Sequence, residues 1–100
     1  MNQVGLLVRL QAKAGQEATV ASYLERAVAQ AEQEAGTPVW VAYRIGETTF
    51  GIFDINPNEA ERQAHLAGEI AATIMGHAEE WLSEPPSIEF HSVLSAKLPA

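Results

Sequence analysis

Two side chains near the middle of the chain, His65 and Asp54, could together perform acid–base chemistry. An imidazole titrates near neutrality, so His65 could remove an acidic phenolic or carbon-bound proton as a general base. Asp54 ends an otherwise apolar row, where a carboxylate needs a partner or pocket water. Each residue has a second interpretation. His65 could be a histidine on a helix surface, and Asp54 could be a structural cap near Asn56.

Five further side chains could line a binding pocket for a small ligand. His77 and Trp81 lie one helical turn apart and could face one cavity, unless Trp81 is core and His77 only flanks it. Tyr43 could present its hydroxyl group to a ligand, or it could be a core tyrosine held by one hydrogen bond. We expect Trp81, Phe50 and Ile52 to form the walls of the pocket.

The sequence contains no motif that would hold a metal ion or a nucleotide. It has no cysteine, its histidines form no His-x-x-x-His pair, and His65 with Glu69 is a lone two-ligand spacing. A phosphate-binding glycine loop and the Gly-x-Ser-x-Gly motif of serine hydrolases are also absent. We therefore expect neither a cofactor nor a bound metal.

The charge of the chain argues against two classes of partner. The formal net charge is −7 over 100 residues, and an acidic surface repels phosphate backbones and anionic lipid headgroups. We therefore expect no nucleic-acid or membrane partner. No apolar run is long enough to cross a bilayer, and the first residues lack the basic start of a signal peptide. Since the absence of cysteine fits a reducing compartment, the sequence predicts a single cytoplasmic domain spanning residues 1–100.

The periodicity of apolar residues predicts the elements that position these side chains. Residues 4–11 alternate as a strand with one fully apolar side. Residues 16–35 place apolar side chains at helical spacing. Residues 39–45 and 48–55 are strand-like on either side of Gly46-Glu47. We expect a two-residue type II′ turn there, because glycine tolerates the positive φ of the first turn position.

The second half of the chain predicts a helix and a final strand. Asn56 is the expected cap of the helix, which is broken or bent at Gly68 and stops before Pro85-Pro86. A last strand runs from residue 87 towards residue 98. The order β-α-β-β-α-β predicts the α+β fold called the ferredoxin-like sandwich, in which the helices cover one face of a four-stranded antiparallel sheet.

A two-residue turn would also fix which side chains share a face of the hairpin. Tyr43 would lie opposite Phe50 on the side towards the helices, and Trp40 would lie opposite Phe53 on the other side. An antiparallel sheet seldom leaves a tryptophan and a phenylalanine together in water. We therefore expect a homodimer in which a second copy covers this face. The expected interface residues are Leu7, Arg9, Trp40, Arg44, Phe53, His91 and Val93.

Three segments of the chain resemble the antibiotic biosynthesis monooxygenase family. They are Val-Arg-Leu-Gln-Ala-Lys-Ala-Gly-Gln-Glu at 8–17, Phe-Gly-Ile-Phe-Asp at 50–54, and Glu-Ala followed by Gln-Ala-His-Leu-Ala between 59 and 67. The resemblance covers nearly the whole chain in order and spacing. It implies a dimeric α/β barrel built from ferredoxin-like subunits, and it matches His65 to the characteristic helix histidine of the family.

The family resemblance does not by itself assign a reaction. Relatives include cofactor-independent oxygenases of polycyclic phenols, haem-degrading enzymes, isomerases and members with no established activity. The haem-degrading branch uses an asparagine in the first strand, where this chain has Val8 or its neighbours. It also uses a tryptophan after the third strand, where this chain has Asp54 or Ile55. These departures argue against haem cleavage, and the missing tryptophan weakens the match to some oxygenases.

The favoured hypothesis is a cofactor-independent monooxygenase-like protein acting on a small ionisable aromatic or quinol-type molecule. In such chemistry the substrate carbanion reduces oxygen, while the protein supplies a base, a dry pocket and donors to the developing oxyanion. We expect His65 to be the base and Asp54 its orienting group. Two alternatives stay open. The chain could be a non-catalytic ligand-binding or interaction domain, or an isomerase or lyase that uses the same base without oxygen.

Overall fold

Seven regular elements make up the part of the chain that the computed structural model describes, residues 3–98. They are β1 (Val4–Gln11), α1 (Glu17–Ala31), β2 (Val39–Arg44), β3 (Thr49–Asn56), α2 (Glu59–Leu66), α3 (Glu69–Trp81) and β4 (Ser87–Ser92). The strands form one antiparallel sheet in the order β2-β3-β1-β4. This is the predicted ferredoxin-like α+β fold. The ends of the predicted domain, residues 1–2 and 99–100, lie outside the described residues.

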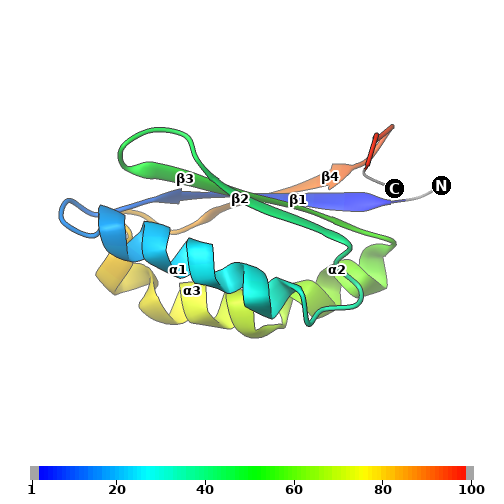
Figure 1. The fold of residues 1–100 in the computed structure, drawn as a ribbon, viewed down its shortest axis with the longest axis horizontal. Helices are drawn as coiled ribbons and strands as arrows, with labels where there is room; N and C mark the ends of the chain where they lie inside the picture. The colour runs from blue at the N-terminus through cyan, green and yellow to red at the C-terminus, as the bar shows by residue number, and fades with distance from the viewer. Residues whose placement is uncertain (1–2, 99–100) are drawn as a thin grey trace.

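All three helices lie against one face of the sheet, as Figure 1 shows. The alternation of apolar residues decides which side chains meet them, because successive strand residues point to opposite faces. From β1 and β3, the core takes Leu10, Phe50 and Ile52, which are 2% exposed each. The helices contribute most of the remaining core, namely Val20, Tyr23, Leu24, Ala27, Ala31, Ile70, Ile74 and Trp81.

The β2–β3 hairpin differs from its prediction by one residue. The backbone N–H groups of Ile45 and Gly46 both donate to the carbonyl of Thr49, at 2.8 and 3.2 Å. The loop therefore has three residues, and within the described residues the glycine with a positive φ is Gly15 rather than Gly46. The predicted two-residue type II′ turn at Gly46-Glu47 is therefore wrong. A slip of one residue moves every side chain of one strand to the other face of the sheet.

The new register moves three predicted site residues to the opposite face. Trp40 pairs with Asp54 and Arg44 pairs with Phe50, so both lie on the side of the helices. There Trp40 packs against the core, and the guanidinium of Arg44 lies 4.8 Å from the centre of the Phe50 ring. Tyr43 lies instead on the open face, where its ring covers Gly51. The predicted placement of Trp40 and Arg44 on the open face, and of Tyr43 under the helices, is therefore wrong.

Several predicted element ends also change. Helix α2 is capped by Asn58, whose Oδ1 accepts from the N–H of Glu61 at 2.9 Å. Asn56, the predicted cap, ends β3 and is fully buried. The predicted break at Gly68 is confirmed, because this residue precedes α3. Helix α1 and strand β4 end earlier than predicted, at Ala31 and Ser92. None of the described helices is long and apolar enough to cross a membrane.

Candidate functional site

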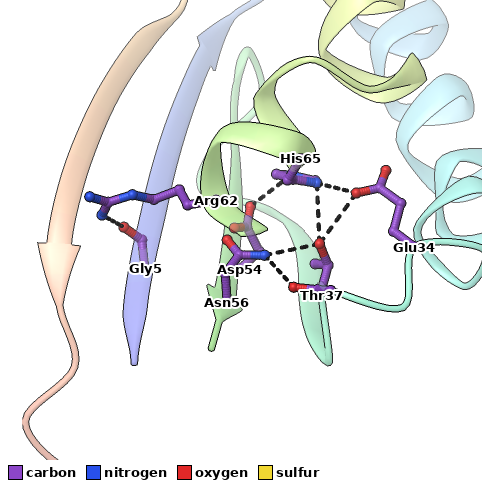
Figure 2. Close-up of polar contacts among 8 residues, drawn as sticks. Gly5, Glu34, Thr37, Asp54, Asn56, Arg62 and His65 are labelled. Atoms are coloured by element: carbon purple, nitrogen blue, oxygen red, sulfur yellow. Dashed lines mark hydrogen bonds and ion pairs between the residues drawn. The ribbon is translucent and has the colours of Figure 1, made fainter. Parts of the chain in front are cut away.

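His65 lies on the buried side of α2, between two carboxylates (Figure 2). Its Nδ1 is 2.5 Å from Oε1 of Glu34, and its Nε2 is 3.1 Å from Oδ2 of Asp54. The imidazole is only 7% exposed and Asp54 is 0% exposed. The interpretation of His65 as a surface residue is therefore wrong, and Asp54 contacts His65 instead of capping a helix.

The sequence around each member explains how the cluster forms. Asp54 follows Ile52 on the helix-facing side of β3, as the alternation predicts. Glu34 comes from the connection between α1 and β2, where the N–H of Thr37 donates to its carbonyl at 3.0 Å. The side chain of Asn56 donates to the Gly36 carbonyl at 2.8 Å and to the Thr37 hydroxyl at 3.0 Å. Asn56 thus ties this connection to the end of β3 and holds Glu34 beside His65.

The two carboxylates keep His65 protonated at neutral pH. Burial is the largest single influence and would lower the pKa of His65, because it penalises the charged form. The contacts and negative charges of Asp54 and Glu34 together outweigh burial and raise this pKa from 6.5 to about 9. His65 is therefore an imidazolium flanked by two anions. It accepts a proton only after it has lost one.

An apolar cavity of about 50 Å³ adjoins the Asp54 side of His65. Asp54 and Trp40 both line it; Oδ1 of Asp54 and Nε1 of Trp40 are buried without a hydrogen-bond partner among the described residues, and Oδ2 of Asp54 contacts His65. Unpaired buried polar atoms require an explanation, such as a ligand or ordered water. The cavity is lined by Leu6, Val8, Trp40, Ile52, Asp54, His65, Leu66, Ile70, Ala71, Ile74, Met75, Pro86 and Ile88.

The size of this inner cavity limits what it accepts without rearrangement. One water molecule occupies about 30 Å³ of the liquid, so the cavity matches dioxygen or a very small polar group. Met75 and Ile88 belong to its lining and are 57% and 41% exposed, so they stand where it meets solvent. A ring-sized molecule could enter only if these exposed side chains moved aside.

A larger outer groove of about 560 Å³ lies on the Glu34 side of His65. It runs between the end of α1 and the helices α2 and α3, and the carboxylate residues Glu34, Glu61 and Glu69 line it. Among the described residues, His65 is the one that borders both this outer groove and the inner cavity. The imidazole therefore separates an acidic, water-accessible space from a small apolar one.

A metal site is not formed by this cluster. The described residues contain no group of three or more His, Asp or Glu side chains arranged to hold a metal ion. A ligating histidine offers a neutral nitrogen to the metal, whereas both nitrogens of His65 face carboxylates. The expectation that the protein works without a cofactor stays a prediction.

Of the five predicted pocket residues, Ile52 lines the inner cavity and the others lie elsewhere. Phe50 and Tyr43 border a separate groove beside α1. Trp81 is buried with its ring 5.3 Å from that of Tyr23, and the exposed His77 stacks on it at 4.2 Å. The structure does not bring these four residues to His65, and a ligand-binding role for them stays a prediction.

Four residues of the site were not predicted from the sequence, namely Glu34, Thr37, Trp40 and Asn56. Glu34 and Thr37 lie 31 and 28 residues from His65, and nothing in local spacing links them to it. Trp40 could be placed beside Asp54 only with the correct hairpin register. Asn56 was the one with a usable signal, since an asparagine ending an apolar strand needs partners for its buried amide.

Comparison with solved structures shows a common fold. A crystal structure of a Nitrosomonas europaea protein of unknown function matches 100% of this chain and 97% of its own, with 51% identity and a TM-score of 0.96. A candidate antibiotic biosynthesis monooxygenase from the same organism matches 92% of this chain and 90% of its own, with 15% identity and a TM-score of 0.81. A candidate monooxygenase of the same kind from Deinococcus radiodurans matches 97% of this chain and 98% of its own, with 18% identity and a TM-score of 0.81. No protein-family model and no curated protein matches the sequence.

Proposed function

Because this chain belongs to the same family as the 51% identical Nitrosomonas europaea protein and has the fold of the antibiotic biosynthesis monooxygenases, we propose a monooxygenase-like activity for it. The substrate is a small ionisable aromatic or quinol-type molecule, and no cofactor takes part. The observation that carries this proposal is the buried pair of His65 and Asp54 at the wall of an apolar cavity. A buried histidine with a shifted pKa and a carboxylate partner beside a cavity is a frequent feature of acid–base sites.

The proposed reaction needs only a proton acceptor, a dry cavity and a hydrogen-bond donor. His65, after losing its Nε2 proton, takes a proton from the substrate, and Asp54 stabilises the imidazolium that forms. The substrate anion then supplies the electrons that reduce oxygen, so that a CH2 group and O2 become C=O and water. The unpaired Nε1–H of Trp40 is the donor for the developing oxyanion.

A second candidate is a domain of the same fold that binds a small molecule without transforming it. Two observations favour this candidate. The cavity of about 50 Å³ is small for an aromatic substrate, and His65, with a pKa of about 9, is mostly protonated at neutral pH. An isomerase or lyase activity needs the same base and differs only in consuming no oxygen.

Oxygen uptake with anthrone as the probe tests these candidates against one another. The monooxygenase-like activity predicts oxygen uptake that matches anthrone loss, and His65→Ala should reduce it by about a hundred- to ten-thousand-fold. Gln63→Ala is the matched control, because Gln63 is exposed on the same helix as His65 and lines neither the inner cavity nor the outer groove. Equal rates in His65→Ala and wild type would overturn the role of His65. Anthrone binding without turnover favours the binding domain, and isomerisation of a carbonyl compound without oxygen uptake favours an isomerase.

We further propose that a second copy of the chain covers the open face of the sheet. On this face Val41, Phe53 and Leu7 lie side by side across three strands, and Val41 is 48% exposed. Arg9 and Glu89 share the face and give it both signs of charge, so two copies related by a two-fold axis could pair these charges. The interface prediction retains Leu7, Arg9, Phe53, His91 and Val93, and it gains Val41 and Tyr43 in place of Trp40 and Arg44.

A further inference from the structure

The two nitrogens of His65 face different spaces, and we infer that Glu34 is a positioning residue that decides which nitrogen exchanges a proton. In this inference, Glu34 holds the proton on Nδ1, so that Nε2 is the nitrogen that exchanges a proton with Asp54 and the inner cavity. The inference rests on the proposed function, since it assigns a role within the same site. Figure 2 shows His65 between the two carboxylates.

The two carboxylate contacts of His65 differ in quality. The Nδ1 atom and Oε1 of Glu34 are 2.5 Å apart with the geometry of a hydrogen bond. The Nε2 atom and Oδ2 of Asp54 are 3.1 Å apart, a longer contact, and Oδ1 of Asp54 has no hydrogen-bond partner among the described residues. An imidazolium that gives up one proton keeps the better hydrogen-bonded one. The neutral form of His65 therefore carries its proton on Nδ1.

Glu34 is itself held in place, as a positioning residue must be. The hydroxyl of Thr37 donates to Oε1 of Glu34 at 3.3 Å and lies 3.4 Å from Nδ1 of His65. Thr37 is buried and is fixed in turn by the amide of Asn56. A partner network of this kind orients a reactive side chain even where it never touches a substrate.

The two carboxylates beside His65 differ in their exposure to water. The Glu34 side chain is 22% exposed in the outer groove, whereas Asp54 is fully buried. The ionisable groups around His65 are Asp54 from β3, Glu34 from the α1–β2 connection, and Glu61 and Glu69 from α2 and α3 along the groove. All four are acidic. Glu34 is the one in direct contact with His65 on the side of the groove.

Nuclear magnetic resonance of the histidine ring nitrogens tests the inference without any substrate. Isotope-labelled wild type, Glu34→Gln and Glu69→Gln are titrated and the ring tautomer is read at high pH. We expect the neutral wild-type ring to be protonated on Nδ1. In Glu34→Gln the titration of His65 should move down by about one pH unit or more, because an adjacent opposite charge is lost. Glu69→Gln is the matched control, since Glu69 lines the same groove but contacts Gln30, and it should titrate like wild type.

Two results would overturn the inference: a neutral wild-type ring protonated on Nε2, or a Glu34→Gln protein that titrates like wild type. If Glu34→Gln fails to fold, Glu34→Asp keeps the charge but withdraws it by one methylene group. This variant should then lower the titration point by less than a complete loss of charge does, and no change at all would count against the inference.

The activity assay separates this inference from the proposed function. If anthrone is consumed, the pH at which kcat/KM rises should fall in Glu34→Gln along with the titration point of His65. A profile that stays in place while the titration point moves would refute a positioning role in the reaction. If no variant consumes oxygen, the proposed activity fails, whereas the tautomer and titration measurements still decide what Glu34 does to His65.

Discussion

The two faces of the sheet differ in which residues lie in an unfavourable environment: charged ones on one face and apolar ones on the other. The helix-covered face buries a charged pair, Asp54 and His65, among apolar side chains. The open face leaves apolar side chains such as Val41 and Phe53 on its surface. A buried charge costs free energy unless it is paired, and an exposed apolar row is a frequent sign of an interface. The comparison thus supports the proposed chemistry on one face and the proposed assembly on the other.

Introducing a charge on each face should give the largest contrast. Trp40→Glu places a carboxylate against the core next to Asp54, its direct partner across the strands. It should unfold the protein, because it removes a packed tryptophan and sets a second carboxylate beside a buried one. Phe53→Glu places the same charge on the open face and should give a folded monomer. Circular dichroism and sedimentation at micromolar concentration check both. A folded Trp40→Glu protein would contradict the observed register, and a dimeric Phe53→Glu protein would contradict the proposed interface.

Removing one partner of the buried pair should destabilise the protein less than Trp40→Glu does. Asp54→Ala leaves the imidazolium of His65 with Glu34 alone, and breaking a buried pair in this way costs about 3–5 kcal/mol. Glu47→Ala removes a carboxylate from an exposed position in the β2–β3 loop and should change stability by at most about 0.5 kcal/mol. Urea unfolding measures both variants. Equal free energies of unfolding would show that the covered face tolerates the loss of one carboxylate beside the buried His65.

The pH dependence of stability should reveal the same pair in the unaltered protein. The pKa of His65 is raised to about 9 in the folded state from 6.5, so the folded state binds the extra proton between these values. The resulting stabilisation is complete below about pH 6.5 and is lost as the pH rises through about 9. Its size is on the order of 3 kcal/mol. Urea unfolding across this range should show the loss in wild type and a much smaller one in His65→Gln.

The smallest effect concerns the hairpin loop that decides which face Trp40 occupies. Gly46 has no positive φ, and a Cβ atom added there would meet nothing within 4 Å. Gly46→Ala should therefore stabilise the protein by about 0.4–1 kcal/mol, because it restricts the unfolded chain. A type II′ turn would instead need glycine at this position. Thermal unfolding distinguishes the two, since a lower melting temperature would contradict the three-residue loop.

Local patterns in the sequence determined most of the architecture. The alternation through β1 and β3 places Leu10, Ile52 and Asp54 under the helices in the structure, as predicted. The break at Gly68 and the β-α-β-β-α-β order are equally local, because caps, glycines and apolar periods act over a few residues. The alternation also singled out Asp54. His65 was singled out by its residue type and by the family resemblance, and neither signal showed that the two side chains touch.

Only the tertiary structure decided how the site is assembled. One extra residue in the β2–β3 loop puts Trp40 beside Asp54 rather than on the open face, because side chains on a strand alternate with a period of two. Glu34 meets His65 across 31 residues, through a connection that Asn56 fastens to β3. Such contacts follow from packing between elements distant in sequence. The carboxylate that sets the state of His65 therefore became visible only in the folded chain.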